Sequence, residues 1–186
     1  MTSLENIVRF YVRRDLSGDE IKKLIGKEPI LYSDLKNYSS IDQVLGTRGY
    51  AVILYQKAEF DGHYVSLFKD SDGNLNFQDS YGFGVDVPIN MGLLPFDKPL
   101  PRYLGQLIER SGMRLITNDF DYQRGKMKGY ADCGRHACLR IRCRSLSNDD
   151  YRYMMTNNVS KFLTPDHNAT ILTLLALDDL NELPKK

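Results

Sequence analysis

Apolar and polar positions follow a helical spacing over the first part of the chain. The earliest apolar residues on such a spacing are Ile7, Phe10 and Tyr11. A short helix is expected over residues 18–25, because Ser17 can cap its first turn and Gly26 can end it. Another short helix is expected over residues 40–45. Residues 1–50 are therefore predicted to be an N-terminal helical segment.

The pattern changes at residue 51 to the apolar runs and alternation that are typical of β-strands. Strands are predicted over residues 51–56, 63–68, 74–79 and 113–117. The sequence Ser71-Asp72-Gly73 favours a tight turn between the second and third of these strands. Those two strands should therefore form an antiparallel hairpin within a larger sheet.

Helical spacing returns in the second half of the chain, over residues 103–109, 133–144, 149–157 and 166–177. The element order lacks the regular alternation of strand and helix found in a doubly wound sheet. The predicted fold class is α+β, with a mixed, mostly antiparallel central sheet flanked by helices. No linker separates two domains, so residues 1–186 are expected to form one domain, with a core over residues 51–145 and C-terminal helices over residues 146–186.

Composition and charge narrow the class further. The chain has 186 residues, 42% of them apolar, which is enough for a hydrophobic core and too apolar for a disordered protein. With 25 basic and 24 acidic residues the net charge is +1, so no charge-driven partner is implied. The apolar runs are too short to cross a bilayer and the first residues lack the pattern of a secretory signal. We expect a protein that works inside a cell or a virus particle.

Two polar residues of the predicted hairpin could form an imidazole oriented by a carboxylate. His63 shares a strand face with Val65 and Leu67, and Asp79 ends the apolar face of the following strand. If both faces pack on one core, the two side chains lie opposite or one diagonal step apart, about 5 to 8 Å. The alternative is that His63 is a surface histidine at a strand end and that Asp79 only begins a turn.

Cys133 is expected in the first turn of the helix over residues 133–144, after a possible Asp132 N-cap. Free N–H groups and the positive end of the helix dipole stabilise a thiolate there. Gly134 follows, and it leaves room for a substrate and a backbone N–H for an oxyanion. Cys133 is therefore a candidate nucleophile.

The other two cysteines do not make a metal site with it. Successive members of the set Cys133, Cys138 and Cys143 are five residues apart, so they lie about 140° apart around a helix. With His136 they lack the paired spacing of zinc ligands, and we expect no metal ion and no cofactor. Cys138 is predicted to be a buried core residue, and His136 a structural histidine whose ring nitrogens have partners.

Four motifs occur in an informative order. They are G-H-Y-V-S-L-F at residues 62–68, F-Q-D-S-Y-G at 77–82, Y-Q at 122–123 and D-C-G-R-H-A-C-L at 132–139. This arrangement resembles the adenovirus maturation protease and its relatives among the ubiquitin-like-protein-specific proteases, especially the cysteine proteases of large DNA viruses, virophages and virus-like transposons. Papain-like proteases place the cysteine first and fit badly.

The resemblance implies a role for each matching residue. Cys133 would be the nucleophile, His63 the general base and acid, Asp79 the orienting carboxylate and Gln123 an oxyanion-hole donor. Asn118 is a second candidate for that donor, because the step from Gln123 to Cys133 is longer than is usual in the family. Tyr64 stands where the family usually has Trp, and a tyrosine could also cover the imidazole.

The function expected from the resemblance is a viral cysteine endopeptidase that cleaves capsid or other virion precursors, after glycine, in the virion or the host cytoplasm. Alternatives are an isopeptidase for ubiquitin-like modifiers, an acetyltransferase with the same His-acid-Cys order, and a binding module in which these residues are only structural. No membrane partner is expected. Stimulation by DNA is a further hypothesis, since basic residues gather near the cysteine, although a solvated face explains them more simply: Arg124, Lys126, Lys128, Arg135, Arg140, Arg142 and Arg144.

Overall fold

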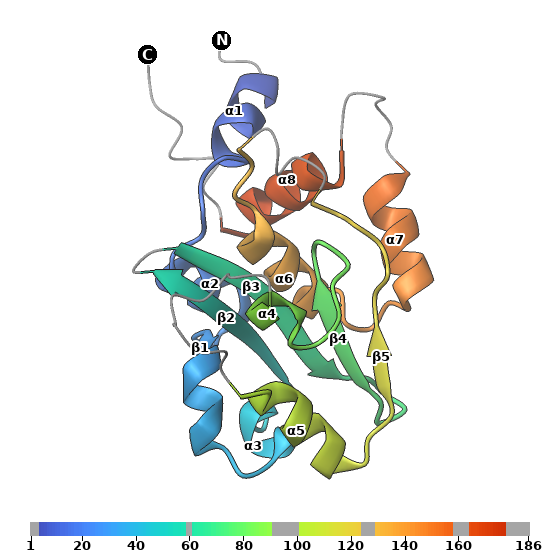
Figure 1. Ribbon diagram of the computed structural model, residues 1–186. Helices are drawn as coiled ribbons and strands as arrows, with labels where there is room; N and C mark the ends of the chain where they lie inside the picture. The colour runs from blue at the N-terminus through green and yellow to red at the C-terminus, as the bar shows by residue number, and fades with distance from the viewer. Residues whose placement is uncertain (1–3, 59–60, 91–100, 124–128, 158–163, 178–186) are drawn as a thin grey trace.

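The computed structural model describes residues 4–58, 61–90, 101–123, 129–157 and 164–177. Within them a five-stranded sheet lies between two groups of helices (Figure 1). The mixed α+β class predicted from the sequence is confirmed. No helix in these ranges is both long enough and apolar enough to cross a membrane. The division of the chain into one domain with three parts stays a prediction.

The sheet has the spatial order β1-β2-β3-β4-β5, which is also the order along the chain. The strands are β1 (Ile30–Leu31), β2 (Tyr50–Ala58), β3 (Asp61–Lys69), β4 (Leu75–Asp79) and β5 (Leu115–Thr117). Strands β2, β3 and β4 are antiparallel neighbours, whereas the two edge strands pair in parallel with β2 and β4. The antiparallel strands β2, β3 and β4 therefore carry most of the pairing. The hairpin predicted between residues 63–68 and 74–79 is the pair β3–β4, called the central hairpin below.

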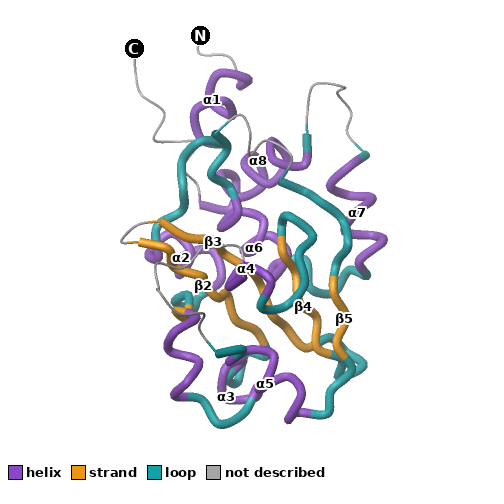
Figure 2. Tube along the Cα trace, viewed as in Figure 1, coloured by secondary structure: helices purple, strands orange, loops and turns teal. Residues whose placement is uncertain are grey.

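Helices cover both faces of the sheet (Figure 2). They are α1 (Leu4–Tyr11), α2 (Gly18–Ile25), η1 (Tyr32–Asn37), α3 (Ile41–Leu45), α4 (Val87–Asn90), α5 (Tyr103–Ser111), α6 (Cys133–Arg142), α7 (Asn148–Thr156) and α8 (Pro165–Leu177). One core lies between the sheet and η1, α3 and α5, and it contains Val65, Leu67 and Phe77. A second core lies between the sheet and α2 and α6, and it contains Val52 and Phe68. A third cluster joins α6, α7 and α8 and contains Leu139, Tyr151 and Ala169. Alternate residues of β3 thus point into different cores.

Local sequence accounts for where α2 begins and ends. The Ser17 hydroxyl accepts a hydrogen bond from the Glu20 amide, and the Glu20 carboxylate accepts one from the Ser17 amide. This reciprocal pair satisfies two N–H groups that the helix itself leaves free. Gly26 ends α2 at φ 73°, a left-handed conformation that glycine adopts without strain. The predicted limits of this helix are confirmed.

Three short elements were not predicted from the sequence. Strand β1 has two residues, α4 has four and η1 is a 3-10 helix, so none of them shows a measurable hydrophobic period. Strand β1 exists because Ile30 and Leu31 pair with Ile53 and Leu54 of β2. Such parallel pairing between distant segments leaves no local signal in the sequence.

Candidate active site

The register of the central hairpin brings His63 and Asp79 together. Val65 of β3 is directly opposite Asp79 of β4, so His63 lies one diagonal step away from it. The imidazole Nε2 is 3.0 Å from Asp79 Oδ2, and both side chains are almost completely buried. The ring N–H does not point straight at this oxygen, so the contact is a close ion pair rather than a well-aligned hydrogen bond.

The imidazole of His63 is held from a second side by an aromatic ring. Tyr81, just after β4, stacks on it with ring centres 4.6 Å apart and planes 16° from parallel. The sequence-based expectation that Tyr64 covers this ring is wrong, because Tyr64 is the next residue of β3 and points to the opposite face. Burial by itself lowers the pKa of His63, but the interactions of the ring with Asp79 and Cys133 outweigh it and raise that pKa to about 9.

Backbone and side-chain contacts fix the position of Asp79. Its Oδ1 accepts a hydrogen bond of 2.7 Å from the Tyr81 amide. The Asn118 side chain bonds both the N–H and the C=O of Asp79, at 2.8 Å and 2.7 Å, and also donates to the Phe120 carbonyl at 3.0 Å. Both amide hydrogens of Asn118 are therefore occupied. Asn118 holds the backbone of Asp79 in place and has no hydrogen left for an oxyanion.

Cys133 is the first residue of α6 and is 5% exposed. Its thiol is one of the groups whose interaction with the His63 imidazole raises the pKa of His63. A Cβ on Gly134 would lie 3.3 Å from Tyr64 Cδ2 and 3.4 Å from Leu16 Cβ. The glycine thus lets Tyr64 pack closely against the start of α6, next to the sulfur.

Gln123 is hydrogen-bonded to Ser80, the residue that follows β4. Its Oε1 accepts a hydrogen bond of 2.8 Å from the Ser80 hydroxyl, and its amide N–H donates to the Ser80 carbonyl at 2.9 Å. The side-chain nitrogen donates to the Tyr130 carbonyl at 3.4 Å, its single donation to a described residue. Among the described residues, the second hydrogen of this amide has no acceptor. Residues 124–128, between Gln123 and Cys133, lie outside the described part of the chain.

The remaining cysteines are free thiols, and Cys138 is fully buried in the core under α6, as predicted. His136 differs from its prediction. Neither of its ring nitrogens has a hydrogen-bond partner among the described residues, and Nε2 lies between two buried carboxylates, Asp132 and Asp166. Burial lowers the pKa of His136, but these carboxylates outweigh that effect and raise it to about 9.

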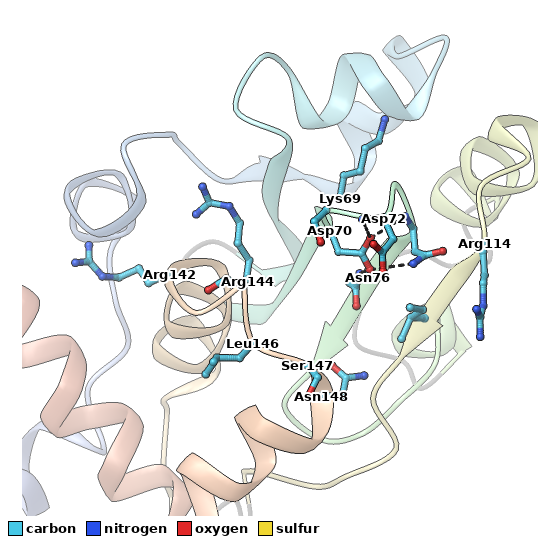
Figure 3. Close-up of a pocket in the computed structure, with 14 residues that line it drawn as sticks. Lys69, Asp70, Asp72, Asn76, Arg114, Arg142, Arg144, Leu146, Ser147 and Asn148 are labelled. Carbon is cyan, nitrogen blue, oxygen red and sulfur yellow. Dashed lines mark hydrogen bonds between the residues drawn. The ribbon is translucent and has the colours of Figure 1, made fainter.

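The basic residues considered for DNA binding do not form one surface. Arg135 and Arg140 are each 1% exposed, so for them both the solvated-face explanation and a DNA-facing role are wrong. Arg142 and Arg144 line a pocket together with Lys69 and Arg114 (Figure 3). This pocket lies at the last residue of β3 and the C-terminal end of α6, far along both elements from His63 and Cys133. The other three lie outside the described residues: Arg124, Lys126 and Lys128.

Comparison with known proteins gives a viral relative. The chain is 28% identical over 173 residues to an uncharacterized protein of the Sputnik virophage, and the match covers 90% of this chain and 98% of the relative. This similarity suggests a viral, virophage-type origin. No protein-family model matches the sequence. Among solved structures, the central domain of an uncharacterized Legionella pneumophila protein is similar with a TM-score of 0.41 and 15% identity, over 88% of this chain and 99% of that one.

Proposed function

We propose that this protein is a viral cysteine endopeptidase. The observation that carries the proposal is a buried imidazole in contact with two groups, a carboxylate 3.0 Å from Nε2 and the thiol that begins α6. An imidazole oriented by an acid and paired with a cysteine at a helix N-terminus is the arrangement that thiol catalysis requires. A purely structural role gives no reason for a thiol, an imidazole and a carboxylate to converge.

The proposed reaction follows from these groups. The Cys133 thiolate attacks the scissile carbonyl carbon, and a tetrahedral oxyanion forms. As the C–N bond breaks, the His63 imidazolium gives its proton to the leaving amine, and a thioester remains on Cys133. His63, now neutral, takes a proton from water, and the resulting hydroxide attacks the thioester and releases the acid. Asp79 keeps the imidazole oriented and stabilises its protonated form throughout.

Gln123 is the proposed side-chain donor to the oxyanion, with the backbone N–H groups at the start of α6 as the others. Replacing Gln123 by Ala should lower kcat by about 10² to 10³-fold and leave KM nearly unchanged, because the lost hydrogen bond forms fully only in the transition state. Steady-state kinetics on one peptide measures both constants. Asn118→Ala is the contrasting variant: it should act through Asp79 and lower stability as well as kcat. A change in KM alone for Gln123→Ala would make it a substrate-binding residue.

Cleavage after glycine is the proposed specificity. The Tyr64 ring packs against Gly134, the residue that follows Cys133, so we expect little room for a substrate side chain beside the sulfur. A peptide with Gly before the scissile bond should be cut, and changing that Gly to Leu should lower kcat/KM by about 10²-fold or more through steric exclusion. The substrates for this measurement are matched fluorogenic peptides that differ only at that residue. Equal rates on the two peptides would contradict the glycine preference.

The proposed biological substrate is a capsid or other virion precursor, cleaved in the virion or in the host cytoplasm. The test is incubation with a capsid precursor from the same viral genome, followed by sequencing of new N-termini. A parallel substrate is a folded ubiquitin-like modifier ending in Gly-Gly and fused to a second protein. A much higher kcat/KM on the fusion would make the enzyme an isopeptidase. Absence of product from both would overturn the peptidase proposal and leave acetyl transfer as the reaction to test.

A further inference from the structure

The cluster of Asp132, His136 and Asp166 lies beside the candidate active site but takes no part in the proposed reaction. Its three side chains are at most 2% exposed. Asp132 precedes α6 and His136 is one turn later, with the His136 amide donating to the Asp132 carbonyl at 3.0 Å, so both side chains lie on one face of the helix. Asp166 comes from the first turn of α8, which packs against α6 (Figure 1).

The distances between polar atoms in this cluster fit the ligands of a metal ion better than they fit hydrogen bonds. His136 Nε2 is 3.5 Å from Asp132 Oδ2 and 3.6 Å from Asp166 Oδ1, which is longer than a hydrogen bond. One ligand atom from each residue lies within 4.8 Å of the others. A zinc-class ion holds nitrogen and oxygen ligands at about 2.0 to 2.2 Å, so two of its ligands are roughly 3 to 4 Å apart.

Polar atoms of this cluster lack the partners that burial normally requires. Both oxygens of Asp132 and both ring nitrogens of His136 have no hydrogen-bond partner among the described residues. The Asp132 side chain does not cap α6, although its position would allow it to. Asp166 is in a different situation, since its Oδ2 accepts a hydrogen bond of 3.3 Å from Thr164. Buried polar groups without partners are costly unless a bound species satisfies them.

We propose that Asp132, His136 and Asp166 bind one divalent metal ion of the zinc class, which joins the start of α6 to α8. One imidazole and two carboxylates are ligands that such an ion accepts, and its charge balances the two carboxylates. The Thr170 hydroxyl, one turn after Asp166 and also buried without a hydrogen-bond partner among the described residues, is a further oxygen on the same face of α8. The role is structural, because the ion fixes the helix that begins with Cys133 and does not enter the reaction.

The first measurement is the metal content of the full chain after chelator treatment, incubation with Zn²⁺ and dialysis. We expect one zinc per chain. At a free Zn²⁺ concentration of roughly 100 times Kd, the midpoint of thermal unfolding should rise by about 5 to 10 °C. Co²⁺ in place of zinc should give visible d–d absorption without a thiolate charge-transfer band, because no cysteine is among the ligands. A chain that holds no zinc and no cobalt would overturn the proposal and make the cluster an ion pair of protonated His136.

Variants separate this site from the candidate active site. His136→Gln and Asp166→Asn should lose the bound zinc and the thermal shift, with far-UV circular dichroism as the check that each variant folds. Cys133→Ala should keep both, and so should Asp86→Asn, which changes a buried carboxylate bound to Tyr32 and Gly105 elsewhere in the fold. Zinc lost from Cys133→Ala but kept by His136→Gln would place the ion on the thiol and overturn the proposal. These outcomes do not depend on peptidase activity.

Discussion

Replacing Cys133 by Ala should abolish peptide cleavage, with kcat/KM reduced by at least about 10⁴-fold. The proposed mechanism leaves no other group to form the acyl intermediate, since the other thiols lie in the core or towards the opposite end of α6. His63→Ala should have a similar effect, and the double variant should be little worse than either single one, because the pair acts as a unit. Initial rates on the glycine-containing peptide measure these losses.

The controls for this prediction are the other two cysteines, which lie in α6 or directly after it. Cys143 is half-buried just after α6, so Cys143→Ser should retain nearly full activity. Cys138→Ser places a hydroxyl in the core and should lower the thermal midpoint while activity at low temperature persists. A peptide electrophile should label the wild-type protein at Cys133 and leave Cys133→Ala unlabelled. Full turnover by Cys133→Ala would show that the thiol is not the nucleophile.

Much of this fold follows from local signals in the sequence. The capping pair at Ser17 and Glu20 and the left-handed Gly26 define one helix completely, and they act through neighbouring residues only. The strand alternation also fixes the register of the central hairpin, because a shift by one residue would turn Val65 and Leu67 out of the core. That register is why His63 and Asp79 could be paired from sequence.

Other features of the site depend on contacts that local patterns do not encode. The stacking of Tyr81 on His63 depends on how the chain turns after β4, and Asn118 reaches Asp79 from the end of the neighbouring strand β5. The cluster around His136 needs Asp166, which only the packing of α8 on α6 brings close. The sequence indicated that His136 was unsuited to a cysteine-based metal site, but Asp166, on a different helix, could not be paired with it from the sequence.

Asp79→Asn should leave the fold intact and lower kcat/KM by about 10³ to 10⁴-fold at neutral pH. The amide oxygen can still accept the Tyr81 N–H that Asp79 Oδ1 accepts now, so the backbone contacts survive. The NH₂ group would then face Nε2, which favours the wrong tautomer and removes the negative charge beside the imidazolium. With that charge gone the pKa of His63 should fall. The alkaline limb of kcat/KM, expected near pH 9 in the wild type, should move to lower pH.

The same substitution should change how stability depends on pH. The pKa of His63 is raised to about 9 in the folded chain, against an ordinary value near 6.5 in the unfolded one. The stabilisation that this difference provides is complete below about pH 6.5 and is lost as the pH rises through about 9. The difference in unfolding free energy between wild type and Asp79→Asn should therefore be largest near pH 6 and shrink towards pH 10. Denaturant titrations at the two pH values measure it, and a difference that is independent of pH would mean that Asp79 acts on His63 by shape alone rather than by charge.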